Sequence, residues 1–238
     1  MNTEPSKPEL LGELAERHIR GRDGLPDAIA RALREAIFEG VFAPNERLHQ
    51  DDIAQQFGVS RVPVREALAK LVTEGLAVQR FNKGIRVAPL SQTDFQDIME
   101  MRALLEPYAL RLSAPHLTAR DYDDAESILD QVTPAAPGSE AAALHWNFHN
   151  RLYGRSGRPR LLAQISSLQI AINRYVLPVW RAVGLSADWG HTHHEIVDAL
   201  RAGDVDEAAR VTGAQIEHAM HRMMDQLPMT VPMEDEDR

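Results

Sequence analysis

The segment from Asp52 to Leu68 constrains the fold of this chain more than any other part. A short helical stretch ends at Phe57, Gly58 follows as a turn residue, and Ser60 can act as the N-cap of a second helix. Two helices joined by so short a turn are typical of a helix–turn–helix motif. This motif commonly binds double-stranded DNA, with its second helix in the major groove.

The flanking segments predict a winged version of this motif over residues 21–90. Residues 25–39 have apolar side chains at a 3.6-residue period and predict a helix that Gly40 ends. The second helix of the motif should extend to Gly75. Alternating residues at 76–80 and 85–88 predict two strands, and the loop between them forms the wing.

The predicted recognition helix and wing contain residues suited to bind DNA. Arg61 and Arg65 are four residues apart and share a helix face, and arginine can bind O6 and N7 of guanine. Alternatively, Arg65 pairs with Glu66 or Glu74 on a solvated face, and Val62 is either a core residue or a contact to a thymine methyl. The candidate DNA-binding residues are Ser60, Arg61, Val62, Arg65, Lys83 and Gly84.

The net charge of −9 is unevenly distributed and agrees with a local DNA contact. Residues 21–90 carry 10 Lys and Arg against 9 Asp and Glu, whereas residues 91–238 carry 13 against 22. The chain has no cysteine, no 18-residue apolar run and no apolar segment in residues 1–10. We therefore expect a cytoplasmic protein without a membrane partner, disulfides or thiolate metal sites.

After Pro89 the strand patterns disappear and helical periods continue almost to the end of the chain. The expected helices span residues 93–113, 118–132, 140–153, 160–175 and beyond, 191–202 and 205–224. The predicted fold class is therefore mainly α, with a winged helix–turn–helix domain followed by an all-helical antiparallel bundle at 91–225. Residues 1–20 form an N-terminal extension without a predicted element, and residues 226–238 an acidic, disordered tail.

The first domain resembles the DNA-binding head of GntR-family transcription regulators. The matching residues are Leu33-Arg34-Glu35-Ala36-Ile37, Gly40, Pro44, Arg47-Leu48, Gly58 through Leu68, Leu71 and Glu74-Gly75-Leu76. Two positions depart from the family pattern. Asn45 stands where glycine is usual, and Asp51 stands where some members have a basic DNA contact.

The bundle resembles the FCD effector domain of the FadR subfamily. The matching segments are 101–106, 148–153 and 193–204, the last being the most specific. This resemblance implies a homodimer that binds an inverted-repeat operator and senses a small metabolite.

Many members of this subfamily hold a divalent metal ion in the bundle through one aspartate and three histidines. By this resemblance His149 and His193 occupy two ligand positions, whereas His145 replaces the aspartate and Gln215 the fourth ligand. His218, one helical turn further on, is an alternative fourth ligand. The resemblance thus implies up to one Zn, Ni or Mn ion per chain. The alternative is that these histidines only line a polar pocket.

The resemblance also implies that Arg102 binds the carboxylate of an organic-acid effector, since guanidinium and carboxylate form two parallel hydrogen bonds. Arg174 is a second candidate for this role. Alternatively, Arg102 forms an ion pair with Glu106 or Glu100 on its own helix.

Enzymatic functions have little support in the sequence. A glycine-rich phosphate loop, a nucleophile elbow and a cysteine nucleophile are all missing. We therefore predict a DNA-binding transcription regulator that responds to a metabolite, with a carboxylate as the expected effector. A regulator that senses the metal itself is one alternative, and a His-rich metallohydrolase is another.

Overall fold

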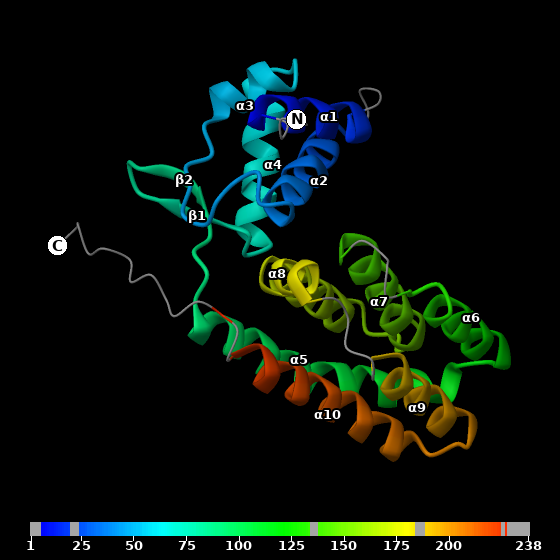
Figure 1. Ribbon diagram of the computed structural model, residues 1–238. Coiled ribbons are helices and arrows are strands. Elements are labelled where there is room, and N and C mark those ends of the chain that lie inside the picture. Colours follow the sequence, from blue (N-terminus) through cyan, green and yellow to red (C-terminus); the bar gives the residue numbers. More distant parts are fainter. Residues whose placement is uncertain (1–5, 20–23, 134–137, 184–188, 225–226, 228–238) are drawn as a thin grey trace. The chain divides into compact units, whose positions relative to one another are not determined.

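The computed structural model describes residues 6–19, 24–133, 138–183, 189–224 and 227. The chain divides into two compact units, Met1–Pro89 and Leu90–Arg238, which we describe separately. Figure 1 shows helices in both units, and the strands of the described residues form one two-stranded sheet. The predicted acidic tail lies outside the described residues, apart from Leu227.

The first unit is a winged helix–turn–helix domain, as the sequence predicts. Its helices are α1 (Lys7–His18), α2 (Leu25–Phe38), α3 (Gln50–Gln56) and α4 (Arg61–Thr73), followed by strands β1 (Ala77–Arg80) and β2 (Gly84–Val87). Helix α2 packs against α1 and α4, and α3 packs against α4. The predicted elements are all present, but the sequence analysis did not anticipate α1.

The wing is an antiparallel pair of strands in which Ala77 faces Val87 and Arg80 faces Gly84. A single bridge between Arg47 and Arg86 adds the segment before α3 to this sheet. Apolar side chains from α2, from α4 and from the residue before β1 are fully buried and anchor the recognition helix: Ile29, Leu33, Leu68, Leu71 and Leu76.

The second unit is an all-helical bundle, which confirms the predicted fold class. Its elements are α5 (Gln92–Ser113), a 3₁₀ turn η1 (Ala114–His116), α6 (Ala119–Leu129), α7 (Gly138–Tyr153), α8 (Pro159–Val183), α9 (Trp189–Arg201) and α10 (Val205–Met224). Helix α8 continues past Pro178 to Val183, so this proline lies inside the helix.

The bundle has two hydrophobic clusters that together position its interior polar residues. One includes Leu110, Phe148, Leu152, Ile165 and Ile196, and joins α5, α7, α8 and α9. The other includes Phe95, Met99, Ile172, Tyr175 and Ile216, and joins α5, α8 and α10. Helix α5 contributes to both clusters, and Figure 1 shows α10 lying along it.

None of the helices in the described ranges is both long enough and apolar enough to span a membrane.

Candidate DNA-binding face and histidine centre

The recognition helix α4 separates its residues into a buried and an exposed face. Val64, Ala67, Leu68 and Leu71 are buried, and this apolar stripe holds the helix against the unit. Four of the predicted DNA-binding residues are exposed at its N-terminal end: Ser60, Arg61, Val62 and Arg65. Ser60 is the extended N-cap residue, as predicted, and the preceding turn depends on Gly58 at φ +63°.

Val62 and Arg65 both lie on the exposed face of α4. Val62 is 53% exposed, so it is not a core residue. Glu74 is bound by Arg34, at 3.0 and 2.6 Å, rather than by Arg65. Both Val62 and Arg65 therefore remain accessible at the surface of α4.

Arg61 forms an ion pair with Asp51 of α3. Both side chains are well exposed, at 73% and 61%, so water screens their attraction. The acidic residue that departs from the family pattern thus contacts a predicted DNA-binding arginine. DNA phosphates would compete with Asp51 for this guanidinium.

The tip of the wing is exposed from Phe81 to Gly84. Gly84 has φ +80°, and a Cβ atom added to it would lie 3.4 Å from the guanidinium of Arg47. The positive φ is what favours glycine at this position, because the added Cβ would make only an ordinary contact with the Arg47 side chain. The exposed Arg47 was missed as a candidate site residue, although it belongs to the segment that carries the GntR resemblance.

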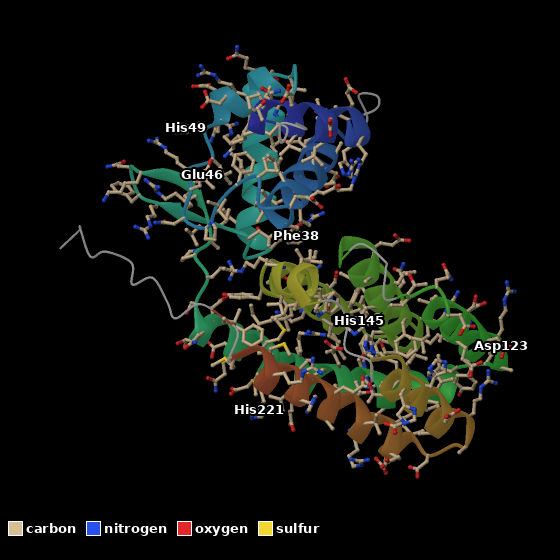
Figure 2. The ribbon with its side chains drawn as sticks, viewed as in Figure 1. Phe38, Glu46, His49, Asp123, His145 and His221 are labelled. Atoms are coloured by element: carbon tan, nitrogen blue, oxygen red, sulfur yellow. The ribbon has the colours of Figure 1, made fainter. Side chains whose placement is uncertain are left out.

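The structure brings together the three histidines that the sequence analysis selected. His145 and His149 lie one turn apart on α7, and His193 comes from α9; their ligand nitrogens all lie within 4.8 Å of one another. His149 and His193 are only 4% exposed. Figure 2 shows His145 within the bundle, whereas His221 lies on α10, where its side chain is exposed.

A chain of hydrogen bonds extends from this centre to α5. The ring nitrogen Nδ1 of His149 lies 2.9 Å from the hydroxyl of Tyr153, which donates to Glu106 Oε2 at 2.8 Å. Arg102 Nε donates to the other carboxylate oxygen of Glu106 at 2.7 Å. Tyr153, Glu106 and Arg102 are all buried, so these bonds form away from solvent.

The direction of these bonds determines the tautomer of His149. A carboxylate paired with arginine only accepts hydrogen bonds, so the single Tyr153 proton points to Glu106. The Tyr153 oxygen must then accept a proton from Nδ1 of His149. The lone pair of His149 is therefore on Nε2, which faces Nε2 of His145 at 3.0 Å.

Burial keeps the imidazoles of His145 and His149 neutral. It lowers the pKa of His145 well below the usual value, and the nearby His193 and Arg102 lower it further. The pKa of His149 is likewise lowered, mainly by burial and then by its histidine neighbours and Arg102. Burial, and then Glu106, raise the pKa of Tyr153 well above its usual value. Neutral imidazole is the form that binds metal ions.

The donor set fits a divalent transition metal. Imidazole nitrogens suit Zn and Ni, and a ring whose second nitrogen is hydrogen-bonded is typical of metal-binding histidines. The residues available for a fourth ligand position are less suited to bind a metal ion. The Gln215 amide donates to the backbone oxygen of Thr192, and His218 is exposed and is not part of the three-histidine group.

The two arginines predicted to bind an effector carboxylate already contact protein carboxylates. Arg102 pairs with Glu106, as the ion-pair alternative expects, and lies close enough to lower the pKa of His145 and His149. Arg174, from α8, pairs with Asp94 at the start of α5 and donates to the Tyr175 hydroxyl at 3.1 Å. A ligand carboxylate would have to replace these partners.

Glu106 and Tyr153 are polar residues that the sequence analysis did not select. Each lies four residues after a selected residue on the same helix, Glu106 after Arg102 and Tyr153 after His149. That spacing was a usable signal, because residues four apart on a helix are neighbours.

Comparison with known protein families finds two matching regions. Residues 25–87 match the family described as "Bacterial regulatory proteins, gntR family", and residues 97–218 match the FCD domain. The first region contains α4 and the wing, and the second contains all three histidines.

Relatives among curated proteins match most of the chain. The chain is 31% identical to the Nta operon transcriptional regulator of Aminobacter aminovorans, over 77% of this chain and 87% of that protein. It is also 31% identical to a probable D-xylose utilization operon transcriptional repressor of Paenarthrobacter nicotinovorans, over 75% and 76% of the two chains.

Solved structures share the fold. A putative GntR regulator from Rhodococcus sp. RHA1 superposes with a TM-score of 0.72 at 23% identity, covering 85% of this chain and 99% of the other. The E. coli protein McbR/YncC gives 0.71 at 21% identity, over 86% and 99%.

Proposed function

This chain belongs to the gntR family of bacterial regulatory proteins and is a DNA-binding transcription regulator with an FCD effector domain, and on that basis we propose that it acts as a metabolite-responsive homodimer of the FadR subfamily. It is not an enzyme, so the metallohydrolase alternative is wrong. Two relatives are named as regulators of operons, which supports a role at a promoter.

In this proposal each winged unit binds one half of an inverted repeat. Arg61 and Arg65 contact guanine edges from the exposed face of α4, and Val62 contacts a thymine methyl. Lys83 and Arg47 contact phosphates from the wing and the segment beside it. Ser60 places the helix N-terminus toward a phosphate, where the helix dipole favours an anion.

The observation that carries the ligand-binding proposal is the convergence of His145, His149 and His193 with a fixed tautomer at His149. We assign these three residues to a divalent metal, with Gln215 as a neutral neighbour. A bound metal would supply a Lewis-acidic position for a ligand oxygen.

The charge of the donor set supports an anionic effector. His145 replaces the family's aspartate, so all three ligands are neutral, and Glu106 is already balanced by Arg102. A dication held there keeps its full charge, which a carboxylate would compensate. Arg102 and Arg174 remain candidates for the far end of such a ligand, each after releasing its present partner.

The proposed DNA contacts are tested on a specific DNA site. This site is first obtained by letting the wild-type protein select its preferred sequence from randomised duplexes. Arg61→Ala and Arg65→Ala should each weaken binding to that site by about 1–3 kcal/mol and relax one guanine preference. Lys70→Ala is the matched control, since it removes a charge from the same helix but from a residue that pairs with Asp27. Wild-type affinity in both arginine variants would refute the assignment of α4.

The proposed response to metal and carboxylate is tested on the complex of the wild-type protein with the same DNA site. Zn, Ni or Mn salts are added first alone, and then with a monocarboxylate such as acetate and a dicarboxylate such as succinate. We expect operator affinity to change by 5- to 150-fold only when metal and carboxylate are both present. A change with metal alone would identify the metal itself as the signal and reject the carboxylate proposal.

A further inference from the structure

An apolar stripe runs along the outer face of α5. Met101, Leu104 and Tyr108 are 40%, 75% and 52% exposed, and their spacing of three and four residues places them on one face. Among the described residues of the second unit, no other large hydrophobic side chain is comparably exposed. Contiguous exposed apolar side chains mark interaction sites more often than isolated ones do.

The remaining sides of α5 are covered by its own unit. The helix packs against α7, α8 and α10, and buries residues that include Phe95, Met99 and Leu110. The stripe is therefore not needed for the fold of a single chain. It is available to a partner along the middle of α5.

Charges at the two ends of the stripe indicate what that partner is. Asp97 lies seven residues before Leu104 and Arg111 seven residues after it, which is about 10 Å in each direction along the helix. Both side chains are exposed. The stripe thus has an acidic end and a basic end, placed symmetrically about its most exposed residue.

A second copy of the same helix matches this pattern in one orientation. Antiparallel packing about a two-fold axis at Leu104 places Asp97 beside Arg111 of the partner subunit, and the symmetry repeats this pair. Parallel packing would bring like charges together. Arg111 Nε binds Asp206 at 3.1 Å, but the guanidinium has further N–H donors for a second carboxylate.

We propose that α5 is the homodimer interface, packing antiparallel on α5 of a second copy with Leu104 at the two-fold axis. Met101 then lies beside the partner subunit's Tyr108, and an ion pair closes each end. The proposal rests on the homodimer of the proposed function and adds where the two copies meet and in which register.

The interface is tested by measuring the mass of the full-length chain with light scattering over a dilution series. Leu104→Glu places two carboxylates at the axis, and should raise the dimer dissociation constant by roughly 100-fold or more. Ser127→Glu is the control, because it adds the same charge to an exposed position on α6. Circular dichroism verifies that both variants are folded.

The possible outcomes distinguish a failure of the proposed α5 interface from a failure of the proposed homodimer. If the wild type is a dimer and folded Leu104→Glu remains one, α5 is not the interface. A monomeric wild type would instead refute the homodimer in the proposed function, and the interface with it.

The register is tested by exchanging the end charges. Asp97→Arg and Arg111→Asp should each weaken the dimer by about 5- to 10-fold, because each places like charges together. The double variant restores opposite charges and should return to near wild-type association. Two weakened single variants without recovery in the double variant would overturn the antiparallel register.

Discussion

A single hydroxyl group at Tyr153 determines which nitrogen of His149 can bind a metal ion. The hydroxyl joins Nδ1 of His149 to Glu106, which Arg102 holds in place. None of these three supporting residues would need to touch a metal ion held at the proposed histidine site. Together they fix the ring orientation and tautomer of His149. The Nε2 lone pair is then already in place, and no free energy has to be spent on ordering this side chain when a metal ion binds.

Tyr153→Phe should therefore lower the affinity for Zn or Ni by about 10- to 100-fold, as loss of an outer-shell hydrogen bond does. Isothermal titration calorimetry of the full chain measures this directly. Tyr175→Phe is the matched control, since it also removes a tyrosine hydroxyl bonded to a carboxylate, at Asp94. Equal metal affinity in wild type and Tyr153→Phe would show that the tautomer is set by other means.

Asp51 is a second residue with a local effect, because it pairs with Arg61. Asp51→Asn should raise affinity for the selected DNA site by about fivefold, since the arginine no longer has to leave a carboxylate. The gain should shrink at high salt. Asp52→Asn removes the same charge one residue away, and an equal gain in that variant would exclude the ion pair as the cause.

At the scale of elements, buried charged groups position the helices of the bundle. Asp121 in the first turn of α6 accepts from the backbone and hydroxyl of Thr118, at 2.8 and 2.6 Å, and pairs with Arg155 at 2.9 Å. These hydrogen bonds, from Thr118 first and Arg155 next, lower the pKa of Asp121 to about 2. The start of α6 is thereby joined to the residues that follow α7.

The pKa of Asp121 predicts part of the acid sensitivity of the fold. A carboxyl group with a lowered folded-state pKa stabilises the fold above its unfolded value of about 3.9, and this stabilisation is lost as the pH falls toward about 2. Asp121→Asn should lower the free energy of unfolding by about 1–3 kcal/mol at neutral pH.

Denaturant unfolding at several pH values checks this prediction. The variant should lose less stability than the wild type between about pH 4 and pH 2. Asp130→Asn, at an exposed position just after α6, is the control. If wild type and Asp121→Asn lost the same free energy of unfolding between about pH 4 and pH 2, the role given to the Asp121 carboxylate would be contradicted.

At the scale of the whole molecule, the proposed metal binding in the bundle should be linked to the stability of the folded chain and, in the proposed homodimer, to the two DNA-binding units. A metal ion that binds only the folded chain stabilises it by mass action. The three ligands come from two helices that are distant in the chain, so the ion should act as a cross-link between α7 and α9.

Zn or Ni at about 100 times its dissociation constant should add about 2.7 kcal/mol to the stability of the wild type. His193→Ala should abolish this gain, whereas His191→Ala should retain it, because His191 is exposed on the same helix. Thermal unfolding with and without metal measures the difference. An undiminished gain in His193→Ala would mean that the ion binds elsewhere.

The sequence by itself determined those features that depend on neighbouring residues. The periodicity of residues 25–39, the Ser60 cap and the turn at Gly58 are local signals, and the structure has α2, α4 and the turn where these signals predict them. The resemblance of residues 193–204 selected His193, whose position relative to α7 no local pattern could provide. Helix α1 was missed in a segment that the sequence analysis had left without an element.

Only the tertiary structure decided which distant side chains meet. His193 reaches His149 across 44 residues of sequence, and Tyr153 reaches Glu106 across 47. The tertiary structure also showed that Asp51 forms an ion pair with Arg61. It showed further that Met101, Leu104 and Tyr108 are exposed, although apolar residues at a helical period are normally buried. The physical reason is that hydrogen bonds and caps within a helix depend on near neighbours, whereas burial and side-chain partners depend on how whole helices pack.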